Sequence, residues 1–370
     1  MKHIINQFNL LAITACVLAA CSGGGNESQV QQKQAQTPPA TTSAPAPDGT
    51  GSNGAKIGID QPRIDTDFWT AFANYVPTKG QELGANLYQT SSNNDAQKMI
   101  ANVQQMLQSD VKAIVLAPQD TAAATSALAA AKAQNIPVVT VDTRPDAGDV
   151  YMVVRADNKA YGTNACIVIG EKLKGEGRVV EFQGALNSIN GRDRSEAFAE
   201  CMKTKYPNIK VIEIPTDWKK EPAIAGLQTA LAGGKVNGIY MQAGGVYLEP
   251  TLAFLKQKNL LKPAGDAEHI VIVSNDGIKS ELEAIKRGDI DATVSQPADG
   301  YAHWALFYAK AAAEGKTFQV GKTEHGSNIV QPRDGLLEDQ IVAPVVTVDG
   351  AKLGDLQTVK ADSPDLWGNK

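Results

Sequence analysis

The segment 136–144, with the sequence IPVVTVDTR, constrains the fold more than any other stretch of the chain. Its three valines form a β-branched run between Pro137 and Pro145. Such a run predicts a short strand that is buried on both faces, as in a parallel sheet. The strand ends at Asp142 and Arg144. Because ligands of open α/β sheets bind beyond the carboxyl ends of the strands, we expect these residues to form one wall of a ligand cleft between two lobes.

The remainder of the chain alternates strand and helix signals. Segments 56–59, 85–88 and 113–116 are typical of strands, and stretches with apolar residues three and four positions apart separate them. A second series with the same rhythm covers 159–294. Alternation of this kind indicates parallel strands joined by right-handed helical crossovers. We therefore predict an α/β fold of two doubly wound parallel-sheet lobes, which suits a chain of 370 residues.

The first residues predict an export signal and not a part of the fold. Lys2 precedes an apolar run at 10–20 that is too short for a typical membrane span. The run leads into LAAC, a bacterial lipobox pattern that predicts lipidation of Cys21. The alternative is an ordinary signal peptide next to an unrelated cysteine. We expect a signal peptide at 1–20, a flexible tether at 21–55, and an exported protein that its lipid anchors to a membrane without spanning it.

Composition and motifs argue against several classes of function. The chain has 35 Lys and Arg against 40 Asp and Glu and no long basic run, so we expect no nucleic-acid partner. It lacks a nucleophile elbow, a phosphate-binding loop and metal-ligand spacing of its histidines. Asp65 and Asp67 could in principle serve glycoside hydrolysis, but a binding cleft needs the same groups. We therefore predict no enzymatic activity, no metal and no cofactor.

Cys166 and Cys201 are the two cysteines that follow Cys21. An even pair in an exported protein favours a disulfide. The alternative is a pair of buried small hydrophobic side chains, and the sequence leaves both open.

Polar and aromatic residues follow the predicted strands of both lobes. Planar polar groups pair with hydroxyls, and aromatic rings pack against the C–H face of a sugar, so this combination predicts a cleft for a sugar or polyol. Taken singly, each residue has an ordinary structural explanation, such as a helix cap for Asp67, core packing for Trp218 and a solvated helix turn for Arg192. The candidate ligand contacts are Asp67, Phe68, Trp69, Asp142, Arg144, Arg192, Trp218, Asp276 and Gln296.

Five short motifs occur in a family-like order: 67–69 (DFW), 136–142, 191–194 (GRDR), 275–277 (NDG) and 292–297 (ATVSQP). With them the chain resembles the periplasmic sugar-binding proteins of ABC transporters, of the ribose-binding type, from about residue 56 to 348. The resemblance implies two lobes joined by a hinge of crossing strands near 157–160, 296–300 and 327–330. It places the N-terminal lobe at 56–158 plus about 298–327, the C-terminal lobe at 159–297 plus about 328–348, and a C-terminal tail at 349–370.

The resemblance also implies roles for single residues. Phe68 and Trp69 would stack on the sugar, and Trp218 would close its opposite face. The polar contacts would come from Asp142, Arg192, Asp276 and Gln296, with Arg144 at the cleft mouth. Two positions depart from the ribose type, because Ala243 and Thr66 stand where that type has Asn. The departures argue against ribose itself and leave room for a larger or differently shaped ligand.

The implied function is capture of a sugar or polyol by a monomer that closes around it and delivers it to the permease subunits of an ABC importer. Two alternatives follow from the same fold. One is a binding protein for a nucleoside or signalling molecule, which the missing Asn at Ala243 suggests. The other is a sensory subunit that docks on a chemoreceptor or kinase.

Overall fold

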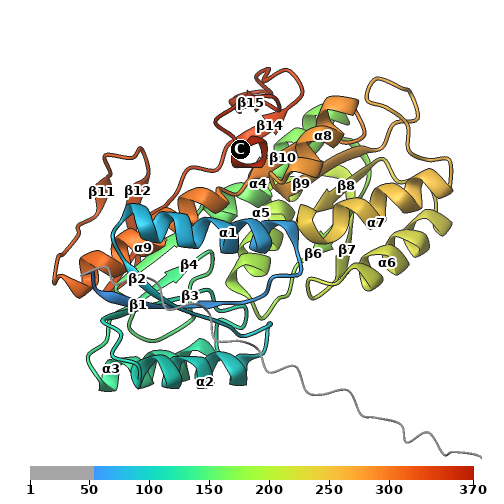
Figure 1. Cartoon of the computed structure of the whole chain (residues 1–370). Helices are drawn as coiled ribbons and strands as arrows, with labels where there is room; N and C mark the ends of the chain where they lie inside the picture. Colours follow the sequence, from blue (N-terminus) through green and yellow to red (C-terminus); the bar gives the residue numbers. More distant parts are fainter. Residues whose placement is uncertain (1–53) are drawn as a thin grey trace, which may run out of the picture. The chain divides into compact units, whose positions relative to one another are not determined.

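The structure is a computed structural model that describes residues 54–370 (Figure 1). The predicted signal peptide at 1–20, the lipidation site Cys21 and most of the predicted tether lie outside the described residues. In the described part, the chain forms two β-sheets with helices packed on them.

The first sheet has eight strands in the order β11-β12-β13-β5-β4-β3-β1-β2. Strands β1 to β5 and β13 pair in parallel, and β11 and β12 pair antiparallel at one end. The bounds are β1 Lys56–Gln61, β2 Asn86–Ser91, β3 Ala113–Leu116, β4 Val138–Val141, β5 Met152–Arg155, β11 Gly321–Lys322, β12 Asn328–Arg333 and β13 Leu336–Gln340.

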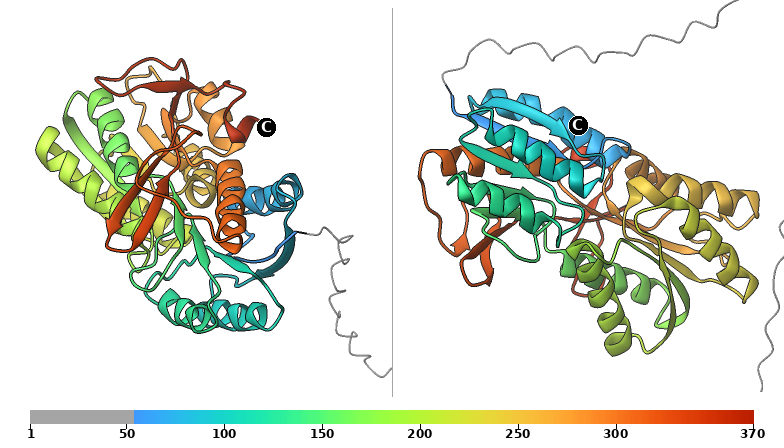
Figure 2. Two further views of the ribbon diagram at one scale, coloured as in Figure 1. Left: turned by 90° about the vertical axis from the view of Figure 1, so that its left-hand side faces the viewer. Right: turned by 90° about the horizontal axis from the view of Figure 1, so that it is seen from below.

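Helices cover both faces of this sheet, as Figure 2 shows. They are α1 Asp67–Glu82, α2 Ala96–Leu107, α3 Ala124–Ala133 and α9 Ala298–Ala313. Alternate strand residues feed the two cores: Val115 and Val139 pack on the side of α1 and α9, and Ile114 and Val138 on the side of α2 and α3. Burial on both faces explains why the strands are short, continuous apolar runs.

The second sheet has seven strands in the order β15-β14-β10-β9-β8-β6-β7, all parallel to their neighbours except β14 against β10. The strands are β6 Glu176–Gln183, β7 Asn208–Pro215, β8 Gly238–Met241, β9 Val271–Asp276, β10 Ala292–Ser295, β14 Val345–Thr347 and β15 Thr358–Lys360. The helices are α4 Asn158–Lys172, α5 Ile189–Lys205, α6 Lys220–Ala232, α7 Gly244–Gln257, α8 Lys279–Arg287 and the 3-10 helix η1 Trp367–Asn369. Two mostly parallel sheets confirm the predicted α/β fold class.

The chain passes between the sheets three times. The crossings lie between β5 and α4, between β10 and α9, and between β13 and β14. The expected third crossing at 327–330 is wrong, because β12 and β13 still belong to the first sheet and the chain leaves it only after Gln340. Residues 328–340 therefore belong to the N-terminal lobe and not to the C-terminal lobe. Part of the expected tail also belongs to the second sheet, as β15.

The strand β13 was not predicted from the sequence, because it contains two charged residues. Glu338 and Asp339 interrupt the apolar pattern, yet both are buried. Glu338 pairs with Arg144 and Arg155, and Asp339 accepts a hydrogen bond from the Tyr308 hydroxyl at 2.9 Å. Buried charges are tolerated when they are paired in this way, and the pairing partners come from distant parts of the chain.

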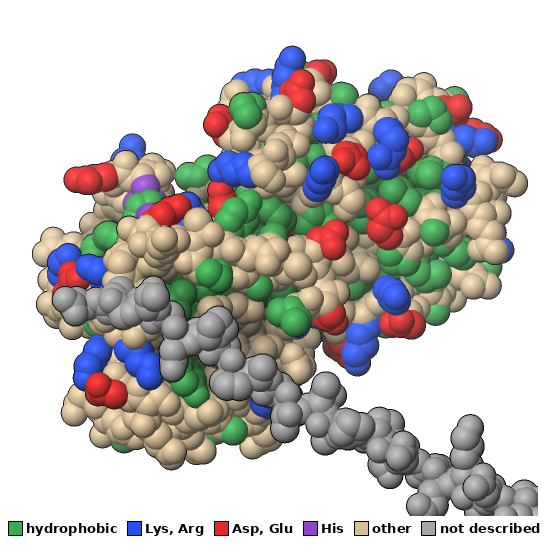
Figure 3. Space-filling model, viewed as in Figure 1, with side chains coloured by type: hydrophobic (Ala, Val, Ile, Leu, Met, Phe, Trp, Pro, Cys, Tyr) green, Lys and Arg blue, Asp and Glu red, His purple; other side chains and the backbone are tan. Residues whose placement is uncertain are grey.

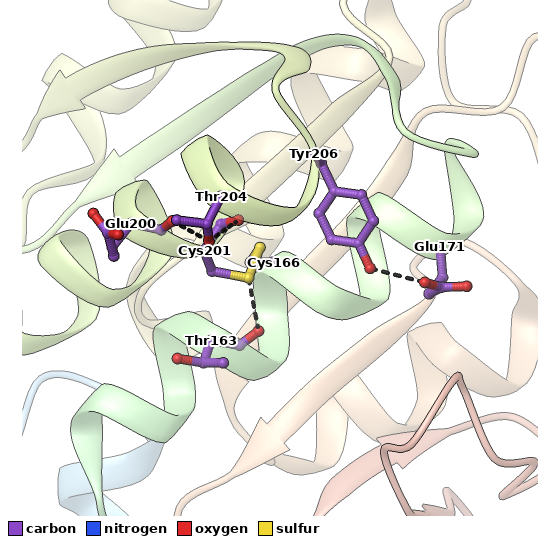
Figure 4. The surroundings of a disulfide bond; sticks show 7 residues. All are labelled: Thr163, Cys166, Glu171, Glu200, Cys201, Thr204 and Tyr206. Carbon is purple, nitrogen blue, oxygen red and sulfur yellow. Dashed lines mark hydrogen bonds between the residues drawn. A yellow bond between two sulfur atoms is a disulfide. The ribbon is translucent and has the colours of Figure 1, made fainter.

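Cys166 on α4 and Cys201 on α5 form a disulfide (Figure 4). The sequence left open a disulfide or two buried free cysteines, and the structure has the disulfide. The two helices approach closely here, since a Cβ at Gly162 would lie 2.2 Å from the carbonyl oxygen of Arg194. The disulfide therefore fastens α5, the helix that carries several of the candidate site residues, to its neighbour.

Candidate functional site

A cavity lies where the carboxyl ends of strands from both sheets meet. The first lobe contributes Arg63, Thr66, Phe68, Trp69, Gln119 and Asp142. The second contributes Ser188, Asn190, Arg194, Trp218, Ala243, Val246, Asp276 and, at a crossing, Gln296. The centres of water molecules can occupy about 50 Å³ of it.

Asp142 directly follows β4 and accepts hydrogen bonds from residues of the other lobe. Its carboxylate accepts hydrogen bonds from Asn190 Nδ2 at 3.1 Å and from Gln296 Nε2 at 2.8 Å. Its backbone is left-handed, with φ of 66°, a conformation that Asp tolerates better than most residues. Burial raises the pKa of the Asp142 carboxyl to about 6, against the opposing effect of Arg194 and Arg155.

Arg194 is the buried cation of the cavity. It donates to Asn158 Oδ1 and to Gln296 Oε1, each at 2.7 Å, and to the Gln242 carbonyl oxygen. Its guanidinium also lies over the Tyr161 ring, 4.8 Å from the centroid. Three fixed acceptors and a ring hold the guanidinium at the cavity, so it can present its charge to a ligand without moving.

The predicted contact Arg192 is not in the cavity. It pairs with Asp146 of the first lobe and donates to the Leu186 carbonyl oxygen at 3.1 Å. Two positions on a helix differ by about 200° in direction, so only one of Arg192 and Arg194 can face the cavity. The sequence motif at 191–194 contains both arginines and does not indicate which of them faces the cavity. The structure therefore assigns the cavity position to Arg194.

Arg144 and Asp67 also lie away from the cavity. Arg144 pairs with Glu338 Oε2 at 3.1 Å, beside the fully buried Arg155. Arg155 in turn donates to Asn190 Oδ1 at 2.9 Å and to Asp193 Oδ2 at 3.0 Å. Asp67 is the exposed first residue of α1. Arg144 thus supports the network behind the site, and Asp67 faces another surface.

Asp276 ends β9 opposite Asp142 in an unusual backbone conformation, with φ of 123°. Its carboxylate accepts from the Gly245 amide at 2.9 Å, and its carbonyl oxygen accepts from the Gln296 amide at 2.8 Å. Burial raises the pKa of the Asp276 carboxyl to about 7. The nearby Glu281 carboxyl, whose pKa burial also raises, accepts from the amide of Gly277 at 2.6 Å.

Three aromatic rings complete the walls. Phe68 and Trp69 lie in the first turn of α1 and pack edge to face, with ring centroids 5.1 Å apart. Thr66 caps this helix by accepting from the Trp69 amide at 3.4 Å, so its hydroxyl serves the helix. Trp218 lies on the second lobe against Gly184, where a Cβ would come within 1.9 Å of the indole ring. Glycine is therefore required at 184 for Trp218 to reach the cavity.

The cavity residues that were not predicted from the sequence include Gln119, Ser188 and Asn190. Gln119 follows β3, and this position at a strand end was the available signal. Gln119 Nε2 and Trp218 Nε1 are buried and find no hydrogen-bond acceptor within residues 54–370. Unpaired buried donors beside two carboxyls are suited to a ligand that both accepts and donates hydrogen bonds, as a polyhydroxylated molecule does.

The chain belongs to the periplasmic binding protein family, because residues 57–317 match the family's periplasmic binding protein domain. The ribose import binding protein RbsB of Haemophilus influenzae is 27% identical over 241 residues, 65% of this chain and 79% of the relative. The xylitol-binding protein of Mycolicibacterium smegmatis is 28% identical, over 66% of this chain and 68% of the relative. These relatives confirm the predicted resemblance to the ribose-binding type.

Solved structures agree with this assignment. An ABC transporter solute-binding protein from Mycobacterium smegmatis with bound glycerol superimposes with a TM-score of 0.66 at 27% identity, covering 72% of this chain and 90% of that one. Membership of the family implies an exported protein.

Among the described helices, none is long and apolar enough to cross a membrane.

Proposed function

We propose that this protein is a solute-binding protein that captures a sugar or polyol between its two lobes and delivers it to an ABC importer. The observation that carries the proposal is the cavity that both lobes build, with two carboxyls, one buried arginine and three aromatic rings. Relatives named for ribose and xylitol support the ligand class.

Each group has a task in this proposal. Asp142 and Asp276 accept hydrogen bonds from ligand hydroxyls, and Arg194 donates to a ligand oxygen. The unpaired N–H groups of Gln119 and Trp218 provide further donors. Phe68 and Trp69 pack against the apolar face of the ligand. A ligand that lacks hydroxyls would leave these buried groups without partners, which is a strong basis for discrimination.

Closure of the lobes is the second part of the proposal. Asp142 in the first lobe binds Asn190 and Gln296, and Thr121 Oγ1 donates to the Asn187 carbonyl oxygen across the lobes at 3.1 Å. The three crossings act as the hinge. Ligand contacts from both lobes favour the closed form, so the apparent affinity depends on the free-energy difference between open and closed forms. Permease subunits then distinguish the closed form from the open one.

We further propose that a lipid on Cys21 anchors the protein to a membrane and that 21–55 serves as its tether. The LAAC pattern at 18–21 supports this proposal. The ligand is proposed to differ from ribose in shape, because Ala243 provides no side-chain amide at the cavity wall and the Thr66 hydroxyl is engaged in the helix cap.

A thermal-shift screen tests the proposed function. The purified protein is heated with pentoses, hexoses, polyols, nucleosides and amino acids in turn. A sugar or polyol at 100 times its Kd should stabilise the native state by about 2.7 kcal/mol, and the shift should vanish in Asp142→Ala. Stabilisation only by amino acids or peptides would exclude the sugar or polyol assignment.

A further inference from the structure

Residues 366–370, here called the clasp, run from the second lobe to the first. Leu366 is buried in the core of the second lobe, and Trp367 Nε1 donates to the Asp276 carbonyl oxygen at 3.1 Å. At Gly368 a Cβ would lie 2.3 Å from the Gly277 carbonyl oxygen, so only glycine allows this approach. The clasp is therefore seated on the loop that follows β9 (Figure 1, near the label C).

The other side of the clasp contacts helices of the first lobe. The Trp367 ring packs edge to face on Phe68, with centroids 6.0 Å apart. The Tyr75 hydroxyl on α1 donates to the Trp367 carbonyl oxygen at 3.5 Å, and Lys370 pairs with Asp299 on α9. These contacts connect the lobes without passing through any of the three crossings.

Both neighbours of the Trp367 side chain belong to the cavity. Phe68 is an aromatic wall, and Asp276 carries one of the two carboxyls. Asp276 has a φ that is rare for a residue with a side chain, and such a backbone persists only where its surroundings hold it. The Trp367 N–H is one of two donors that hold its carbonyl oxygen, the Gln296 amide being the other.

The contacts of the clasp with the first lobe are small in number. Beside them a groove of about 620 Å³ lies between the outer face of α1 and the clasp, lined by Asn74 and Thr78 on one side and Lys279 on the other. The polar and aromatic contacts of the clasp with the first lobe are one ring pair, one long hydrogen bond and one partly exposed ion pair. Contacts of this size add little to the stability of either lobe, but they favour the arrangement in which the lobes are together.

We propose that Trp367 is a positioning residue of the ligand site and that the clasp shifts the equilibrium of the lobes towards the closed form. Trp367 holds the Asp276 carbonyl oxygen by a hydrogen bond and the Phe68 ring by packing. It does not line the cavity itself. The prediction of altered ligand affinity rests on the proposed function. The prediction that the clasp favours the closed arrangement of the lobes does not.

The test compares Trp367→Ala, Trp367→Phe and Lys370→Ala with the wild type. Xylitol and D-ribose serve as probes in titration calorimetry and stopped-flow dissociation. Trp367→Ala loses the ring pair and the hydrogen bond, so Kd should rise about tenfold, mainly through faster dissociation. Trp367→Phe keeps a ring and loses only the N–H, so Kd should rise about threefold. The radius of gyration of ligand-free Trp367→Ala in solution scattering should exceed that of the wild type.

Trp304→Ala is the matched control. Trp304 stacks on His325 within the first lobe, with centroids 3.5 Å apart, so its loss should lower Tm and leave the radius of gyration and Kd unchanged. The proposal is overturned if Trp367→Ala behaves like this control, or if amide exchange at 66–72 and 276–278 is the same in Trp367→Ala and the wild type. If neither probe binds the wild type, xylitol and D-ribose are excluded as ligands, and the scattering and exchange results still decide the role of the clasp.

Discussion

Asp142 and Asp276 are buried residues that place two carboxyl groups at one cavity. Burial disfavours the charged form of each, which raises the pKa of Asp142 to about 6 and that of Asp276 to about 7. Their spacing in the sequence does not indicate that the two carboxyl groups lie at one cavity, because the strands β4 and β9 belong to different lobes. At the residue scale, the site is therefore tuned by the packing around it.

These pKa values predict how the stability of the ligand-free protein depends on pH. Each carboxyl binds a proton more tightly in the folded state than in the unfolded state, where its pKa is about 3.8. The contribution to stability is fully present below about pH 4 and is lost as pH rises through about 6 to 7. The free energy of unfolding, measured by urea denaturation from pH 5 to pH 8, should therefore decrease.

Asp276→Asn isolates one carboxyl in this experiment. The variant cannot titrate at 276, so the difference in unfolding free energy between wild type and variant should itself change with pH in the range 5 to 8. A difference that is constant over this range would contradict the assigned pKa. A polyol ligand should oppose the trend, because its hydroxyls donate to the ionised carboxylates and its affinity should rise with pH.

At the scale of single elements, the first turn of α5 decides which arginine reaches the cavity. Arg194→Ala leaves the acceptors on Asn158 and Gln296 without a donor, so it should weaken binding of the stabilising ligand by about 3 kcal/mol. Arg192→Ala removes a partly exposed ion pair with Asp146 and an exposed hydrogen bond to the Leu186 carbonyl oxygen, and its cost should stay within about 1 kcal/mol. Calorimetric titration measures both.

Arg194→Lys completes the comparison, since it keeps the charge and loses the planar fork of donors. Its affinity should lie between those of the wild type and Arg194→Ala. Equal losses in the Arg192 and Arg194 alanine variants would show that the helix register places both side chains at the ligand.

The disulfide between α4 and α5 should contribute to stability and not to ligand contact. It closes a loop of sequence separation 35, for which loop-closure entropy predicts about 3–4 kcal/mol. The double variant Cys166→Ala/Cys201→Ala should lose about that much unfolding free energy in chemical denaturation. Its Kd for the stabilising ligand should match that of the wild type at a temperature where both are folded. A large loss of affinity without a loss of stability would point to a role at the site.

At the scale of the whole molecule, the proposed anchor and the two-lobed body are separable. When the full chain is expressed in a bacterial host, the wild type should sediment with membranes. Cys21→Ser should appear in the soluble exported fraction, because one thiol carries the lipid in this proposal. Ser22→Ala, the adjacent control, should stay with the membranes. Retention of Cys21→Ser in the membrane fraction would remove the lipid anchor from the proposal.

Surface charge is also a property of the whole molecule. Acidic and basic side chains lie interspersed on the face shown in Figure 3, in line with the net charge of −5. The surface on this face offers no continuous basic patch of the kind that attracts a nucleic-acid backbone.

The sequence by itself determined the alternation of strands and helices, and with it the positions just after strands where Phe68, Asp142 and Asp276 stand. The reason is local: β-branched runs and helical periodicity depend on neighbouring residues, and a fold of parallel strands gathers the strand ends at one edge. Trp218 and Gln296 were predicted from the same rule together with the family resemblance.

Only the tertiary structure decided which of these residues meet. The choice of Arg194 over Arg192 depends on the first turn of α5, a detail that a motif containing both arginines does not carry. The strand β13 holds Glu338 and Asp339, and their partners Arg144, Arg155 and Tyr308 come from elsewhere in the chain. The clasp at Trp367 lies about three hundred residues from Phe68, and such long-range packing leaves no periodic signal in the sequence.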